Sequence, residues 1–396
     1  MKTVKTVKFA YQPNQSVSLL LETFRRMCND AIRIGLTAKP NSRFELIRLA
    51  YRKLKEYNLH TLYILSACEV AFSICKNKRA NSNPYVKRAF LKLGSQAYRL
   101  DYLLLRIPIS AKRFIYLPLD GSPYHLSFLA DESLKRGSVT ITDSSVLIAF
   151  SKEPADMKAV GKMGVDVNEK NVTWSDTSGN TKTHGELADV VEIQERYKEI
   201  RAKISARTKN DRRIQQGLLS RYGKRERNRT VQRIHKVSRE IVEHAKEKGL
   251  VIIMERLTGI RKLYRKKSGQ GNSYRGRMNS WMFREIQRQV AYKATWEGIS
   301  VTFVNPRGTS RNCPDCGSRV VSLQERKLFC VECDKTWDRD VLASRNIMAA
   351  VVPAVRPSGW SSEGESRMQE GAGNPQAKGW KSVVGKTDGT YALGGD

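Results

Sequence analysis

The chain has 396 residues, and its 71 Lys and Arg against 39 Asp and Glu give a formal net charge of +32. This length predicts two or three domains. The charge argues against an enzyme of small metabolites and favours a polyanionic partner, because Lys and Arg displace counterions condensed on phosphates. A membrane surface or a ribosome would also account for it, but there is neither a signal peptide nor an apolar run of membrane-spanning length, which predicts a soluble, cytoplasmic protein.

The first 155 residues predict a β-module with a helical insertion. Residues 3–11 (TVKTVKFAY) alternate as a strand does, and two long helical patterns follow up to residue 78. From about Tyr98 the pattern is that of strands: YRLDYLLLRIPI, RFIYLPLD and SVTITDSSVLIAF, separated by Pro and Gly.

A second unit begins near Gly161. VGKMGVDVNEKNVTWSD predicts two strands joined by a turn at 168–171, and residues 186–248 predict long helices with a break around Tyr222–Gly223. LVIIMERL and ISVTFVNP predict buried strands on either side of the amphipathic helix NSWMFREIQRQVAYKATWEG. After Pro353 a composition rich in Gly, Ser, Glu and Gln predicts a disordered tail.

Positive charge is concentrated between Arg196 and Arg277, where 26 Lys and Arg outnumber 7 Asp and Glu, a net of +19. A solvated helical face is the ordinary explanation of such a run. At this density, with so few acids available for i,i+4 pairs, a helical hairpin facing nucleic acid is favoured. Its candidate phosphate contacts are Arg225, Arg227 and Arg229.

Four of the seven cysteines are bunched as CPDC and CVEC, thirteen residues apart, at Cys313, Cys316, Cys330 and Cys333. Each Cys-x-x-Cys turns two sulfurs towards one ion, so two of them complete the tetrahedron of a structural Zn²⁺ site with no open position. Gly317 stands where such a turn needs an adaptable residue. Four unrelated core cysteines, or a redox pair, explain this spacing less well.

Three carboxylates stand in unusual places. Asp166 lies among valines within a strand, and Glu255 ends the apolar run LVIIME, so each is costly to bury without a cation. Asp340 opens the helical pattern DVLASRNIMAA, where it is either an N-cap or a ligand. Carboxylates suit hard ions such as Mg²⁺, whereas thiolates suit Zn²⁺. Two acids on separate strands and one on a terminal helix form the layout of a ribonuclease H-like nuclease with two Mg²⁺ ions.

The stretches GVDVNEKNVTW, LVIIMERLTGI and DRDVLASRNI, together with the two Cys-x-x-Cys pairs, resemble the TnpB family of transposon-encoded RNA-guided nucleases, which is similar to compact type V CRISPR effectors. The resemblance covers about Gly161 to Met348 best. It implies that Asp166, Glu255 and Asp340 are catalytic Mg²⁺ ligands and that Asp338 is not. This chain departs from the family pattern at Asn168, where Gly is frequent, and at Leu342, where Asn is usual.

The resemblance also implies an α+β multidomain fold. A split β-barrel, or wedge (1–14 and 91–155), carries a helical recognition-like domain (15–90), and a RuvC-like α/β nuclease domain (160–305 and 338–352) carries an inserted zinc ribbon (306–337), before the tail (353–396). The implied function is cleavage of double-stranded DNA that is matched by a guide RNA transcribed from the transposon end and lies beside a short flanking motif. Two alternatives stay open: a guided DNA-binding regulator without cleavage, which would lack at least one acid, and a zinc-ribbon RNA-binding protein, which would leave Asp166 and Glu255 unexplained.

Overall fold

The structure is a computed structural model that describes residues 2–78, 82–110, 112–265 and 269–350. The predicted tail lies outside the described residues. The chain divides into two compact units, with the boundary between Glu153 and Pro154. Within the described ranges, no helix is both long enough and apolar enough to cross a membrane.

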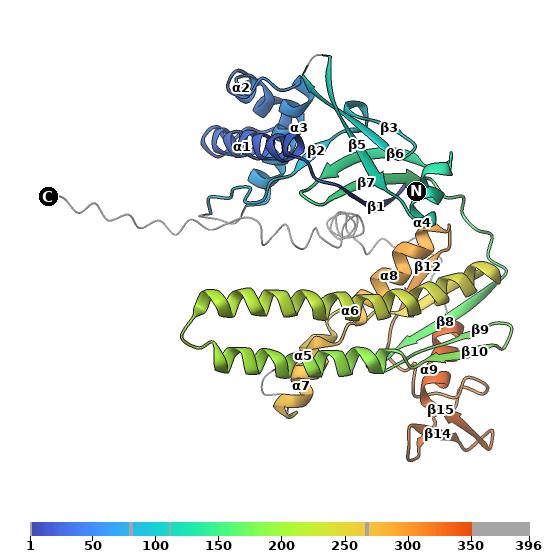
Figure 1. The fold of residues 1–396 in the computed structure, drawn as a ribbon. Coiled ribbons are helices and arrows are strands. Elements are labelled where there is room, and N and C mark those ends of the chain that lie inside the picture. Colours follow the sequence, from blue (N-terminus) through green and yellow to red (C-terminus); the bar gives the residue numbers. More distant parts are fainter. Residues whose placement is uncertain (1, 79–81, 111, 266–268, 351–396) are drawn as a thin grey trace. The chain divides into compact units, whose positions relative to one another are not determined.

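The first unit is an antiparallel sheet with three helices inserted after its first strand (Figure 1). The inserted helices are α1 (Gln15–Ala38), α2 (Arg43–Lys55) and α3 (Thr61–Lys76). The strands are β1 (Thr3–Tyr11), β2 (Leu91–Leu93), β3 (Arg99–Asp101), β4 (Leu104–Ser110), β5 (Arg113–Asp120), β6 (Lys135–Ile141) and β7 (Ser145–Lys152). They pair in the order β2-β6-β7-β1-β5-β4-β3. The strand-helices-strands succession agrees with the sequence prediction, whereas closure into a barrel stays a prediction.

Local sequence explains these elements. Val7, Phe9 and Tyr11 of β1 alternate into the core, as the period of a strand requires. Helix α1 begins where the side chain of Asn14 accepts a hydrogen bond from the Val17 N–H at 2.8 Å. Two short helical elements were not predicted, the 3-10 turn η1 (Ser95–Ala97) and the helix α4 (Pro123–Ala130).

The second unit is built on a five-stranded mixed sheet with the order β10-β9-β8-β11-β12. Its strands are β8 (Gly161–Val167), β9 (Val172–Asp176), β10 (Thr181–His184), β11 (Leu250–Glu255) and β12 (Val301–Val304). The three strands β8, β11 and β12 are parallel, whereas β9 and β10 run antiparallel to their neighbours. The predicted strands and the turn after β8 are confirmed, since the Asn168 N–H donates to the Asn171 carbonyl at 2.9 Å.

Between β10 and β11 the chain forms a helical hairpin of α5 (Leu187–Arg207) and α6 (Arg212–Glu247). The predicted break at Tyr222–Gly223 is wrong, because α6 runs through it and the hairpin turns at 208–211 instead. Asp211 starts α6 by accepting hydrogen bonds from the N–H groups of Arg213 and Ile214, at 3.0 and 2.9 Å. A single Gly inside a helix of this length costs only about 1 kcal/mol, which does not end it.

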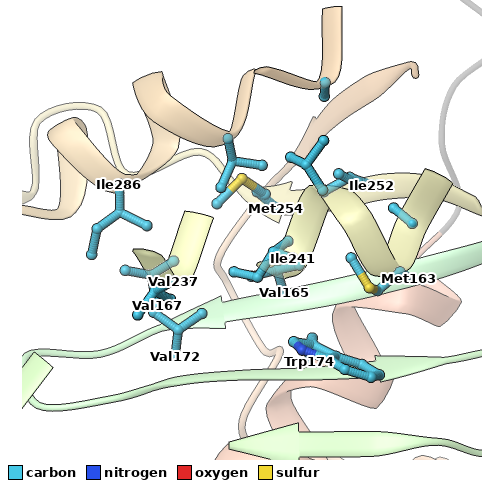
Figure 2. Packing of buried hydrophobic residues seen from close by; sticks show 14 of the residues in the cluster. Met163, Val165, Val167, Val172, Trp174, Val237, Ile241, Ile252, Met254 and Ile286 are labelled. Carbon is cyan, nitrogen blue, oxygen red and sulfur yellow. The ribbon is translucent and has the colours of Figure 1, made fainter. Parts of the chain in front are cut away.

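The two faces of this sheet pack against different helices. Met163, Val165 and Val167 of β8 alternate onto the face that forms the main core (Figure 2), together with residues of α6 and of α8 (Phe283–Trp296). The residues between them, Gly164 and Asp166, therefore point to the opposite face. The predicted amphipathic helix begins later than expected, at Phe283, and is preceded by η2 (Ile260–Tyr264) and α7 (Asn272–Ser280).

The opposite face is covered by α9 (Arg339–Ala349), which follows a small three-stranded sheet of β13 (Val321–Ser322), β14 (Lys327–Cys330) and β15 (Lys335–Asp338). Helix α9 and the five-stranded sheet come into contact at Gly164 of β8. A Cβ built there would lie 2.1 Å from the Ser344 carbonyl oxygen and 2.5 Å from the Met348 backbone nitrogen. Only glycine allows this approach, and the Ser175 and Ser344 hydroxyls, 2.7 Å apart, add a hydrogen bond across the contact.

Candidate active site and metal centre

Two of the candidate acids lie at the same edge of the second unit's sheet. Asp166 is next to the last residue of β8, and Glu255 is the last residue of β11. These strands are parallel neighbours, and Met254 pairs with Val165, so both carboxylates come to the carboxyl end of the sheet on the α9 face. Asp166 is 7% exposed and Glu255 is half-buried.

The third acid is supplied by the start of α9. Asp338 is its N-cap and accepts hydrogen bonds from the N–H groups of Asp340 and Val341, at 2.8 and 3.1 Å. The N-cap explanation considered for Asp340 is therefore wrong. With the cap provided by its neighbour, Asp340 is 4% exposed in the first turn of a helix that packs on β8.

The three carboxylates lie close enough to affect one another. Burial, followed by the charges of Glu255 and Asp340, raises the pKa of Asp166 from 3.8 to about 7. Burial also raises the pKa of Glu255. Two of these acids are thus harder to ionise than usual, and the oxygen donors of the three fit a hard divalent ion.

Neutral side chains hold one oxygen of each acid. Asn168 donates to Asp166 Oδ2 at 2.7 Å, Asn171 to Asp340 Oδ2 at 3.0 Å, and the Thr309 hydroxyl to Glu255 Oε1 at 2.6 Å. Sequence reasoning missed the roles of Asn171 and Thr309. It noted Asn168 only as a departure from the family pattern, and here that residue orients the first acid. The other departure, Leu342, is fully buried in the core of the small sheet.

A basic residue that sequence reasoning also missed lies beside the acids. Arg326, in the turn between β13 and β14, forms an ion pair with Asp340 through Oδ1. Asp340 is thus the acid with both oxygens engaged by the protein. The turn offered no sequence signal, because nothing along the chain indicates that it lies over α9.

The four cysteines form one cluster. Their sulfurs lie within 4.8 Å of one another, and among the described residues no other group of three or more Cys, His, Asp or Glu ligand atoms is this compact. The Sγ–Sγ distances of 3.9 Å for Cys313–Cys333 and 3.5 Å for Cys316–Cys330 match the roughly 3.8 Å edge of a tetrahedron with Zn–S bonds of about 2.3 Å.

Backbone geometry supports the two cysteine turns. Gly317 has a φ of +79° and Asp334 has a φ of +50°, each at the position directly after the second cysteine of its pair. Hydrogen bonds from the Ser318 hydroxyl and N–H lower the pKa of Cys316 to about 6, which favours the thiolate that Zn²⁺ binds. The cluster has the donors and the shape of a closed zinc site.

The candidate phosphate contacts lie on the helical hairpin. Arg225, Arg227 and Arg229 are exposed on α6, and the Arg225 guanidinium lies 5.5 Å from the centre of the Tyr222 ring. Neighbouring acids are partly engaged, since Glu226 pairs with Arg201 of α5. The three arginines remain available to an anionic partner.

Comparison with solved structures defines the class of fold. The chain matches a structure of a Cas12f1–sgRNA–target DNA complex with a TM-score of 0.55 and 12% identity, over 85% of this chain and 83% of that one. This is a Cas12f-like α+β fold with a four-cysteine cluster. The family model of the Cas12f1-like TNB domain matches residues 283–347.

Related sequences define the family. TnpB-like protein MJ0751 of Methanocaldococcus jannaschii is 33% identical over 61% of this chain and 89% of its own length. The putative RNA-guided DNA endonuclease InsQ of Escherichia coli is 40% identical over 17% of each chain, and the CRISPR-associated endodeoxyribonuclease Cas12f1 of Sulfoacidibacillus thermotolerans is 31% identical over 28% of this chain and 25% of its own. The chain belongs to the TnpB family.

Proposed function

We propose that this protein is a Mg²⁺-dependent, RNA-guided DNA endonuclease whose second unit is a RuvC-like nuclease domain. The observation that carries the proposal is the meeting of three acids from distant segments, two at the carboxyl ends of adjacent parallel strands and one at the start of a helix packed over them. Its relatives include proteins named as RNA-guided and CRISPR-associated endonucleases, which supports the same activity.

The residues fall into three groups: those that would bind metal, those that would bind nucleic acid, and those that stabilise the fold. Asp166, Glu255 and Asp340 would hold two Mg²⁺ ions, which supply an activated water and stabilise the leaving oxygen of a phosphodiester. Asn168, Asn171 and Thr309 each hold one oxygen of these acids and thereby orient the other. Arginines of α6 would contact phosphates of the guide RNA or of the double-stranded DNA target. The cysteine cluster would bind Zn²⁺ and hold the small sheet against the start of α9.

The test is cleavage of a plasmid that carries a target matched by the bound guide, with Mg²⁺ present. The guide would be the RNA, transcribed from the transposon end, that co-purifies with the protein. Asp166→Ala, Glu255→Ala and Asp340→Ala are each expected to abolish cleavage while leaving RNA and DNA binding largely intact, because phosphate contacts come from other residues. Asp338→Asn is the matched control, since Asn caps a helix about as well as Asp and this variant should still cut.

Cleavage that survives Asp340→Ala but not Asp338→Asn would show that the wrong aspartate is assigned. If none of these variants changes cleavage, the metal site lies elsewhere. A wild-type protein that binds the matched plasmid without cutting it would favour the alternative, a nuclease-silent, RNA-guided DNA-binding regulator on the same fold. The presence of all three acids argues against that alternative.

A further inference from the structure

The contact between Arg326 and Asp340 is built into the backbone. The Arg326 carbonyl accepts a hydrogen bond from the Arg339 N–H at 2.9 Å, and Lys327 pairs with Asp338 across β14 and β15. These contacts fix the turn over the first residues of α9. Both Glu325 and Arg326 have positive φ, +55° and +63°, a conformation that non-glycine residues seldom adopt unless the surrounding structure enforces it.

Arg326 pairs with a carboxylate that a metal ion would also need. The Asp340 oxygen that faces Arg326 is Oδ1, and Asn171 already holds Oδ2. Asp166 and Glu255 make no such pair with a basic side chain in the described part of the chain; each has only a neutral donor. A divalent ion at Asp340 would therefore compete with the Arg326 guanidinium for the same carboxylate.

The Arg326 side chain, unlike that of Asp340, is also accessible to a partner from solvent. The Asp340 side chain is 6% exposed, whereas that of Arg326 is 51% exposed. Arg326 borders a groove of about 440 Å³ that is also lined by Arg311, Arg319 and Arg339. Four guanidinium groups around one groove attract anions, and arginine binds phosphate through two parallel hydrogen bonds. A phosphate in this groove would offer Arg326 a second partner.

We propose that Arg326 is a latch on the metal site: it occupies Asp340 while no nucleic acid is bound and releases it when a nucleic-acid phosphate in the groove binds its guanidinium. The substrate thereby raises the affinity of the acids for divalent metal, which limits cleavage by the unloaded protein. This inference rests on the proposed function, because it takes the three acids as the metal site.

The experiment measures Mn²⁺ binding to the zinc-loaded full-length chain by electron paramagnetic resonance of the free ion. Each protein is titrated alone and with a phosphorothioate thymidine tetranucleotide, and Mn²⁺ bound by the oligonucleotide itself is subtracted. The variants are Arg326→Gln, Lys327→Gln as a matched charge control at the exposed neighbouring residue, and Asp340→Asn. Retained zinc and circular dichroism establish that each variant is folded.

For the wild type we expect weak Mn²⁺ binding that tightens about two- to five-fold with the oligonucleotide, the size of effect typical of a partly exposed ion pair. Arg326→Gln should bind at the tighter level in both conditions, and Lys327→Gln should match the wild type in both conditions. The latch is refuted if Arg326→Gln, without oligonucleotide, binds Mn²⁺ no more tightly than the wild type. It is also refuted if the oligonucleotide strengthens Mn²⁺ binding by Arg326→Gln as much as it does for the wild type. Unchanged binding in Asp340→Asn would instead refute the metal site, and with it the proposed function.

Discussion

The buried acid Asp166 should make the metal-free protein less stable than it would be without its charge. Its pKa is raised from 3.8 to about 7 by burial and by its two acidic neighbours. At about 1.36 kcal/mol per pKa unit, full ionisation costs at most about 4 kcal/mol. We expect Asp166→Asn to recover about 2 kcal/mol of this, because the amide keeps an acceptor for Asn168 but loses the charge that strengthens that hydrogen bond.

The sign follows from which state holds the proton more tightly. The folded state holds the proton of Asp166 more tightly than the unfolded state does. The free-energy cost of ionising Asp166 on folding is therefore absent below pH 3.8, grows as the pH rises and is complete above about pH 7. Asp166→Asn should thus raise the midpoint of thermal unfolding at pH 8 by about 4–8 °C, at about 2–4 °C per kcal/mol for a unit of this size. The gain should shrink towards pH 5, and the stabilised variant is expected to have lost cleavage.

The assay is calorimetry of zinc-loaded protein dialysed free of Mg²⁺. Asp176→Asn is the matched control, because that acid is also buried and the hydrogen bonds from Asn180 and His244 outweigh its burial and lower its pKa. It should lower the midpoint. If Asp166→Asn is no more stable than the wild type at pH 8, or if its gain is the same at pH 5, the electrostatic reasoning fails.

Three further changes should have distinct effects. Replacing Cys313 and Cys330 by Ser should remove about one equivalent of zinc, measured by mass spectrometry, and lower stability, because zinc affinity becomes folding free energy; full zinc retention would refute the site. Gly164→Ala should cost more than about 2 kcal/mol and weaken cleavage, because its Cβ meets the α9 backbone; an unchanged melting midpoint would contradict this. Neutralising the exposed arginines of α6 (Arg225, Arg227 and Arg229) should weaken nucleic-acid binding for all sequences and lower its salt dependence. An unchanged slope of binding against salt concentration would argue against phosphate contacts.

Features that depend on residues close together in the sequence were predictable from it. The strand around Asp166, the strand ending at Glu255 and the helix after Asp338 follow from the period of apolar residues. The cysteine turns follow from the Cys-x-x-Cys spacing, and Gly317, where an adaptable residue was expected, has a positive φ in the structure. The break predicted within residues 186–248 is misplaced, because a helix interior tolerates Gly223, whereas the side chain of Asp211 starts α6.

The sequence by itself determined which residues are candidates, since a carboxylate in an apolar strand is conspicuous wherever it occurs. Only the tertiary structure decided which of them meet and what surrounds them. The pairing of β8 with β11, the contact of α9 with Gly164 and the position of Arg326 over Asp340 join segments far apart in the chain. Such contacts depend on strand order and helix packing, which no local period encodes, and they set the pKa of Asp166 and the proposed latch.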